Sequence, residues 1–281
     1  NKAGSIVVWD SVSGKVVSEF RFGGTVKNRE PIISGVQLLG DTGLVAGIDV
    51  STSSLVVFAI GGDGNPVAVR KLGNDVLGIA YSAEQSSIFI LNSDESKPDG
   101  SQNEMLSIDA ASGLTKWKMN VGKTERMAVN SSSDEIVGVD GDVISVYSAT
   151  DHSLRRQGKL PESIIRNGGD VAWSPDGSKI AYTGSSGAIT VVDSVKFTQA
   201  APSIKVENGK EVASFVWRSD SSAIAVGTIK QDSSGFRSGD DTYVFRVDAT
   251  GWSKRMCEIA GQGFSSGEWD KYVGDVMPYD P

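Results

Sequence analysis

Cysteine and histidine are almost absent from this chain, whose 281 residues include one of each, Cys257 and His152. A single cysteine cannot build an internal disulfide framework or a multi-thiolate metal site. A single histidine cannot supply a zinc site with two histidines, and His152 lies in a polar, turn-like run. We therefore expect no metal site and no catalytic residue of this kind.

Long hydrophobic runs are also missing. The longest, such as residues 55–60, end after about six residues, whereas a helix that crosses a membrane needs about 20. Basic charge is scarce, because 27 Lys and Arg residues face 35 Asp and Glu residues, for a formal net charge of -8. A nucleic-acid partner requires Lys and Arg concentrated on one face. We expect neither membrane insertion by this segment nor binding of nucleic acid.

The chain does contain a recurring pair of short motifs. In the first motif, an apolar pair precedes a polar turn of about five or six residues, and a second apolar strand follows. Its five copies have equivalent positions at Leu39, Tyr81, Val129, Trp173 and Trp217. A spacing of about 44 residues is typical of the blades of a β-propeller. Trp173 and Trp217, in adjacent units, are predicted to be buried at equivalent places.

The second motif is an alternating strand that ends at an Asp or Ser turn. Its copies are residues 6–10, 55–58, 105–109, 143–147, 189–193 and 243–248. Several copies continue through a turn into a further strand, so each unit supplies four antiparallel strands. Such a sheet cannot bury both faces alone, but stacking around a common axis covers them. The sequence predicts an all-β fold, a β-propeller of six or seven four-stranded blades.

The phase of the repeats predicts the domain organisation. Five complete units are visible, and residues 5–20 form only the second half of a unit. We expect a propeller over residues 1–259 whose first blade lacks its N-terminal part. A closing segment at residues 260–281 is expected to contain a short helix, with Ser265 as its cap. Because the chain begins with Asn1 and with half a unit, we expect it to be a piece of a longer protein.

Two stretches resemble WD-repeat propellers, namely Trp9 with Asp10 at the end of the first strand and the hairpin at residues 174–181. The resemblance spans nearly the whole chain. It departs from the family pattern in two respects, because the Gly-His pair that begins many such repeats is absent and only the first repeat ends in Trp-Asp. The resemblance implies a propeller and says little about function.

The end of the chain resembles a more specific group, the terminal segment of actinobacterial WD-repeat proteins. The matching positions are residues 256–261, Glu268, Trp269, Tyr272, Pro278 and Tyr279. In those proteins the propeller is commonly the C-terminal part of a longer chain with a signalling ATPase, a kinase or a membrane-anchoring region. The resemblance implies a second cysteine just beyond Pro281, which could pair with Cys257. The alternative is that Cys257 is a buried small hydrophobic side chain.

A second resemblance points to another class of propeller. Residues 106–118 resemble a repeat of the pyrroloquinoline-quinone propellers, in which Asp, Gly and Trp residues lock successive blades. Enzymes of that kind hold calcium with clustered carboxylates and clamp a quinone near the axis. No such cluster stands at matching positions in this sequence, so we interpret the likeness as a sign of blade packing.

The function that these observations favour is a non-catalytic protein-interaction scaffold or sensor domain of a larger bacterial protein, without a cofactor. The alternative is a propeller enzyme, either a metal-dependent hydrolase or a quinone-dependent dehydrogenase. The resemblance favours a location at the extracytoplasmic face of a bacterial membrane, with the cytoplasm as the alternative.

Two insertions interrupt the compact blade pattern, at residues 92–104 and 230–241, each between the second and third strands of its unit. Loops carried on rigid scaffolds often hold recognition residues. In WD-repeat propellers such loops emerge on the narrower face, which often binds partners. The predicted protein-binding residues are Asp94, Lys97, Asp99, Phe236, Arg237 and Asp240. The pair formed by Phe236 and Arg237 is the sharper choice, because aromatic and Arg side chains dominate binding hot spots.

Overall fold

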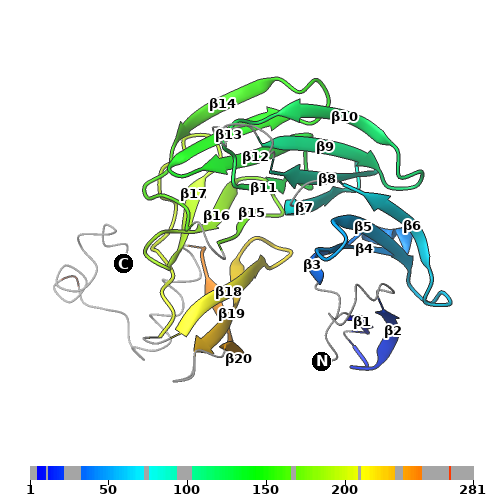
Figure 1. Ribbon diagram of the computed structural model, residues 1–281. Helices are drawn as coiled ribbons and strands as arrows, with labels where there is room; N and C mark the ends of the chain where they lie inside the picture. Colours follow the sequence, from blue (N-terminus) through cyan, green and yellow to red (C-terminus); the bar gives the residue numbers. More distant parts are fainter. Residues whose placement is uncertain are drawn as a thin grey trace.

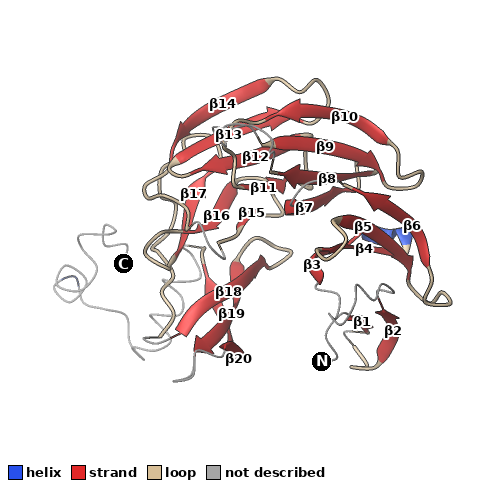
Figure 2. Ribbon diagram, viewed as in Figure 1, coloured by secondary structure: helices blue, strands red, loops and turns tan. Residues whose placement is uncertain are grey.

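The computed structural model describes residues 5–10, 12–21, 33–72, 76–93, 103–165, 169–207, 210–231 and 237–248, and residue 266. Within these residues the chain forms twenty β-strands and the short 3-10 helix η1 (Gly40–Thr42). The strands make six antiparallel sheets that follow one another around an arc (Figure 1). Strands account for nearly all of the regular structure (Figure 2), so the predicted all-β propeller fold is confirmed.

Each sheet uses consecutive strands of the chain. The first three sheets contain β1 (Ser5–Trp9) and β2 (Val16–Arg21); β3 (Ile33–Leu38), β4 (Leu44–Asp49), β5 (Ser54–Ala59) and β6 (Pro66–Lys71); and β7 (Val76–Ser82), β8 (Ser87–Asn92), β9 (Glu104–Asp109) and β10 (Thr115–Asn120). The last three contain β11 (Arg126–Val129), β12 (Glu135–Asp140), β13 (Val143–Ser148) and β14 (Leu154–Lys159); β15 (Val171–Trp173), β16 (Lys179–Thr183) and β17 (Ile189–Asp193); and β18 (Lys210–Trp217), β19 (Ala223–Gln231) and β20 (Arg237–Arg246). The described residues contain no helix with the length and apolar character needed to cross a membrane.

The number of blades differs from the prediction. The structure shows five blades, each led by an inner strand, namely β3, β7, β11, β15 or β18, together with the two-stranded sheet β1–β2. The prediction of six or seven blades was therefore wrong. It assumed that the half unit at residues 5–20 would be completed by inner strands, but among the described residues β1 pairs with β2 alone.

Among the residues that the structure describes, the last two blades have three strands in place of the predicted four. In the blade β15–β17, a segment beyond β17 pairs with it as two isolated bridges, Ile189 with Ile204 and Val192 with Gln199, and not as a regular strand. Pro202 lies between those bridges and has no backbone N–H to donate to a ladder. The fourth position of this blade is thus occupied by an irregular segment.

The hydrophobic core lies between the sheets, as five separate clusters. Each cluster joins side chains from two consecutive sheets, so that every blade packs against its neighbour. Between β11–β14 and β15–β17, for example, Ile144 and Val146 pack with Ile180 and Tyr182. The middle strands are buried on both faces, which explains why β8 has six buried residues in succession.

Trp173 and Trp217 are buried at equivalent places in adjacent blades, as predicted. Their side chains are 6% and 8% exposed, respectively. The indole Nε1 of Trp173 donates a hydrogen bond to the carbonyl oxygen of Ala128 at 3.2 Å, and that of Trp217 donates to Ala172 at 3.3 Å. Each tryptophan therefore joins its own inner strand to the inner strand of the preceding blade.

Trp117 also joins two adjacent blades, nearer the outer edge of the propeller. Its ring lies 5.7 Å from that of Phe89 in its own blade and 4.3 Å from that of His152 in the next blade, measured between centroids. Asp109 closes the adjoining turn by accepting hydrogen bonds from the backbone N–H and hydroxyl of Ser112, both at 2.8 Å. These contacts agree with the interpretation of residues 106–118 as a blade-packing motif.

Candidate functional site

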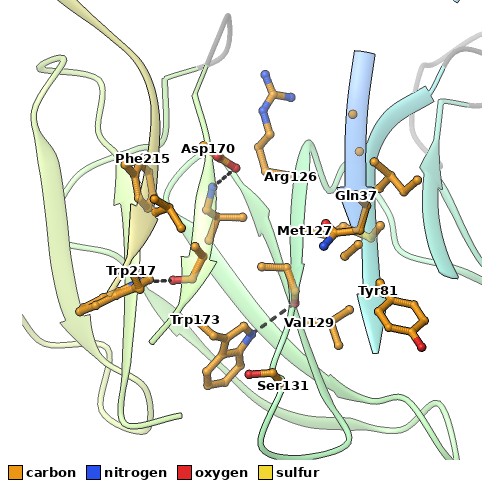
Figure 3. Close-up of a pocket in the computed structure, with 18 of the residues that line it drawn as sticks. Gln37, Tyr81, Arg126, Met127, Val129, Ser131, Asp170, Trp173, Phe215 and Trp217 are labelled. Carbon is orange, nitrogen blue, oxygen red and sulfur yellow. Dashed lines mark hydrogen bonds between the residues drawn. The ribbon is translucent and has the colours of Figure 1, made fainter. Parts of the chain in front are cut away.

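A cavity of about 900 Å³ lies where the five inner strands converge (Figure 3). Its walls come from β3, β7, β11, β15 and β18, so that every blade contributes. Polar and apolar surface contribute about equally to its wall, and the apolar lining includes Val36, Leu77, Ile79, Met127, Val129, Val171, Phe215 and Val216. Cavities of this size with a few polar groups are typical ligand sites in proteins.

Two apolar residues of this wall are well exposed. Alternate side chains of an inner strand face its two neighbouring blades, so that Met127 packs with the preceding blade and Ala128 with the following one. Val36 in β3, from the first of the five blades, and Val216 in β18, from the last, are 51% and 62% exposed. Gly35 permits a close approach of β3 to β7, because it has φ +59° and a Cβ there would lie 2.5 Å from Cγ2 of Ile79.

One end of the cavity carries charge of both signs, from Arg126 and Asp170 (Figure 3). Arg126 is the first residue of β11. Its Nε donates to the carbonyl oxygen of Gly169, and its Nη1 donates to that of Glu125, both at 2.7 Å. Two fixed carbonyl acceptors thus hold the guanidinium group in one orientation at the cavity wall.

Asp170 precedes β15 and lies at the same end of the cavity. Its Oδ1 accepts a hydrogen bond from the backbone N–H of Val171 at 2.8 Å. Asp170 is exposed to solvent, and partial desolvation by the surrounding protein raises the pKa of its carboxyl group. The N–H of Val171 and the charge of Arg126 act in the opposite direction. Figure 3 shows the hydrogen bond from Val171 to Asp170.

The rest of the cavity has only uncharged polar groups among its described lining residues. Gln37 lies in the middle, and its Nε2 donates to the carbonyl oxygen of Leu38 at 3.2 Å. Tyr81 and Ser131 lie toward the end away from Arg126 (Figure 3). The cavity is therefore polarised, with both charges at one end and hydroxyl groups at the other.

The charged end shares a face of the propeller with the junctions between second and third strands. The antiparallel register places Arg126 opposite Val139, near the end of β12. In the same way Val76 pairs with Asn92, and Lys210 pairs with Lys230. Both predicted insertions therefore begin on the face where Arg126 and Asp170 open the cavity. We call this the Arg126 face.

The predicted protein-binding residues lie at the edge of what the structure describes. Asp94, Lys97, Asp99 and Phe236 lie outside the described residues. Arg237 and Asp240 belong to the backbone of β20. Their placement as a shared binding site stays a prediction.

The described parts of the insertion at residues 230–241, namely 230–231 and 237–241, extend two paired strands and do not form the irregular loop that the sequence suggested. Gln231 pairs with Arg237, and Lys230 pairs with Ser238. Sequence reasoning missed this because the residues are polar on both faces of the hairpin, so no hydrophobic alternation marks them as strands. Backbone pairing with the neighbouring strand supplies the order instead.

Polar contacts stabilise the extended hairpin at its base. Thr228 Oγ1 donates to the carbonyl oxygen of Asp241 at 3.0 Å and accepts from the N–H of Asp241 at 3.1 Å, which closes the local bulge. Lys210 Nζ donates to Asp241 Oδ2 and to the hydroxyl of Tyr243, both at 2.6 Å. The hydrogen bond from Lys210 to the carboxylate of Asp241, and next the one from the hydroxyl of Tyr243, lower the pKa of Asp241.

Sequence reasoning also missed Arg126 and Asp170. The signal that could have found them is positional, because each lies at the start of the inner strand of its repeat. In a ring of repeats these positions converge on the axis. Among the described residues, no group of three or more His, Cys, Asp or Glu side chains is arranged to hold a metal ion.

Comparison with known proteins gives a fold and no family. No protein-family model matches the chain, and no curated protein matches it. Its structure is similar to a chain of hydrazine synthase from Kuenenia stuttgartiensis, with a TM-score of 0.62 and 11% sequence identity. The similarity covers 81% of this chain and 66% of that chain. At such low identity the likeness shows the fold alone, and the chain is a β-propeller.

Proposed function

We propose that this chain is a non-catalytic protein-interaction domain whose binding surface is the Arg126 face. The observation that carries the proposal is the extension of the blade β18–β20 on that face. Trp217 pairs with Ile224 as Trp173 pairs with Ile180, so the two blades are in register at the opposite end. The extra residues of the longer blade must therefore project from the Arg126 face.

The length of the projection follows from the strand lengths. β19 has nine residues, whereas β16 has five. Four extra residues at about 3.3 Å each extend the hairpin by about 13 Å. A projecting hairpin whose backbone is hydrogen-bonded loses less backbone entropy when a partner binds than an irregular loop would. The predicted residue Arg237 pairs with Gln231 at the end of β19, and the predicted residue Phe236 precedes it in the sequence.

We also infer from the sequence the class of propeller and the kind of protein to which this chain belongs. Trp9 with Asp10 and the hairpin at residues 174–181 support a WD-repeat propeller, and the terminal segment supports a larger actinobacterial protein. In this proposal the propeller is the recognition or sensor part of that protein, at the extracytoplasmic face of the membrane.

A binding experiment with matched variants tests the proposal. The full chain is used as bait in an extract of its source organism, as wild type and as Phe236→Ala/Arg237→Ala. The control is Val12→Ala/Lys15→Ala, which removes a 95% exposed apolar side chain and a basic one from a turn on the opposite face. We expect the first variant to lose a partner that the control retains. Equal recovery of every partner by both folded variants would contradict the proposal.

The second candidate is a propeller enzyme, either a metal-dependent hydrolase or a quinone-dependent dehydrogenase. It is favoured by the name of the similar structure, hydrazine synthase, which is an enzyme. Turnover of an ester, lactone or alcohol substrate that a chelator abolishes would support this candidate over the interaction domain.

A further inference from the structure

β6 is the outer strand of the first complete blade and lies at the rim of the arc (Figure 1). Among the described residues, it pairs with β5 on one side and has no strand on the other. The N–H of Leu72, just beyond β6, donates to the carbonyl oxygen of Ser53. Because hydrogen-bonding positions alternate along an antiparallel strand, the backbone of Arg70 faces β5, and that of Val69 and Lys71 faces outward. The rim of this blade is therefore a strand edge with outward N–H and C=O groups.

The exposed side chains of β6 are apolar at positions where the other outer strands carry charge. β2, β6, β10 and β14 each pair with a third strand through the same one-residue bulge. At the bulged position and at the exposed position two residues later, β2, β10 and β14 have Val17 and Glu19, Lys116 and Lys118, and Arg155 and Gln157. β6 has Val67 and Val69, which are 59% and 62% exposed. Each of the other strands thus carries at least one charge at these two positions, whereas β6 carries none.

Charges on an edge strand hinder its pairing with a strand of another protein, because the added strand would bury them. β6 lacks this protection at Val67 and Val69. Pro66, which has no N–H, limits pairing only at the first end of the strand. At the other end, Lys71 is exposed and makes no ion pair with the part of the chain that the structure describes. The edge thus combines outward backbone groups, an apolar pair and one cationic side chain.

We propose that the outer edge of β6 binds an extended peptide segment of a partner protein, which adds to the blade as a further strand. The segment has apolar, β-branched side chains against Val67 and Val69, and a carboxylate that pairs with Lys71. Backbone hydrogen bonds hold such a strand, and its alternate side chains provide selectivity. A second copy of this chain fits less well, because β6 contains no acidic residue to pair with Lys71 of the other copy.

Fluorescence polarisation with synthetic peptides tests the edge. The probe is a labelled peptide of about seven residues whose extended form has valine and glutamate on one face and threonine on the other. One control peptide has proline at its centre, which removes an N–H, and the other has lysine in place of glutamate. We expect the full chain to bind the probe with a Kd below about 1 mM, the proline peptide at least about 10-fold more weakly, and the lysine peptide at least about 3-fold more weakly at low ionic strength. Absence of saturable binding up to about 1 mM, or equal affinity for either control peptide, would overturn the proposal.

A matched pair of variants assigns the binding to β6. Val69→Gln gives β6 the residue type that β14 has at the equivalent position, Gln157, and we expect it to weaken binding of the probe by about 5-fold or more. Val195→Gln makes the same change at a 66% exposed valine in a turn, and should leave the affinity unchanged. Both valines are exposed, so both variants should fold, and circular dichroism spectra check this. Equal effects of the two variants would overturn the proposal.

Hydrogen exchange locates the peptide on the backbone. In the chain saturated with probe, the amides of Val69 and Lys71 should exchange at least about 10-fold more slowly, whereas that of Arg70, which faces β5, should change little. Slower exchange at β2, β10 or β14 in place of β6 would overturn the proposal. Slower exchange at Val69 that depends on the concentration of the chain alone would assign the edge to a second copy, and would overturn it as well.

This inference goes beyond the proposed interaction function and does not rest on it. The edge of β6 belongs to the first of the five blades, and the extended hairpin of β19 and β20 belongs to the last. Peptide binding at β6 therefore succeeds or fails independently of partner binding at Phe236 and Arg237.

Discussion

Truncation of Trp173 to Ala is expected to lower the free energy of unfolding by about 3–5 kcal/mol. The indole is 6% exposed and packs in the cluster between the sheets β11–β14 and β15–β17. The guanidinium carbon of Arg156 lies 6.0 Å from the centre of its ring. The side chains around it come from regular strands of two sheets, so they cannot collapse fully into the space that the indole leaves. The carbonyl oxygen of Ala128 would also lose its donor.

A second substitution separates packing from hydrogen bonding. Trp173→Phe keeps much of the apolar contact but removes the Nε1–H donor, and we expect a loss of about 1–3 kcal/mol. Trp9, which is 61% exposed, is the control, and Trp9→Ala should change stability by less than about 0.5 kcal/mol. Urea denaturation followed by circular dichroism measures all three. A loss below about 1 kcal/mol for Trp173→Ala, or an equal loss for Trp9→Ala, would refute the assigned register.

Three further predictions concern other parts of the fold. Hydrogen bonds from Ser112 lower the pKa of Asp109 to about 2, so the stability that its carboxylate contributes is present above the ordinary pKa of about 3.8 and is lost as pH falls toward 2. Asp109→Asn should therefore make stability less dependent on pH between about 4 and 2. An unchanged acid denaturation curve would contradict this contribution of Asp109. Gly35→Ala should destabilise the protein by more than about 1 kcal/mol, and Ile79→Ala should relieve part of that loss in a double-mutant cycle, since a Cβ at Gly35 would meet Ile79. Arg156→Ala should lower the free energy of unfolding by about 1–3 kcal/mol, because Arg156 binds the partly buried Glu135 and donates a hydrogen bond to the carbonyl oxygen of Ser194 in the next blade. Removal of a mostly exposed surface ion pair should lower it by about 0–1 kcal/mol. Equal losses for the two variants in chemical denaturation would contradict the role of Arg156 in joining the blades.

The repeat spacing predicted the blades and the inter-blade tryptophans because both depend on local sequence. An apolar pair, a polar turn and a second apolar strand specify a hairpin wherever they recur. Equivalent positions such as Trp173 and Trp217 then have equivalent neighbours. The blade count was overestimated because the half unit at residues 5–20 does not itself contain the strands that would complete it.

The charged pair in the cavity could not be found in the same way. Arg126 and Asp170 are 44 positions apart, and each is an ordinary polar residue at the start of a short strand. Their proximity depends on the convergence of adjacent blades at the axis, which local patterns do not encode. The extension of β19 and β20 was missed for a different reason, since polar residues on both faces carry no alternation for a strand prediction.

Photo-crosslinking from both faces of the propeller tests the central claim most directly. A photoreactive residue is placed at Lys230 or Asp142 on the Arg126 face, and at Asp63 or Lys196 in turns between third and fourth strands on the opposite face. The full chain is irradiated in an extract of its source organism, and adducts are identified by mass spectrometry. If the Arg126 face is the binding surface, we expect Lys230 and Asp142 to form adducts with one common protein partner, and Asp63 and Lys196 to form none. Adducts of equal or greater yield from Asp63 and Lys196 would contradict it.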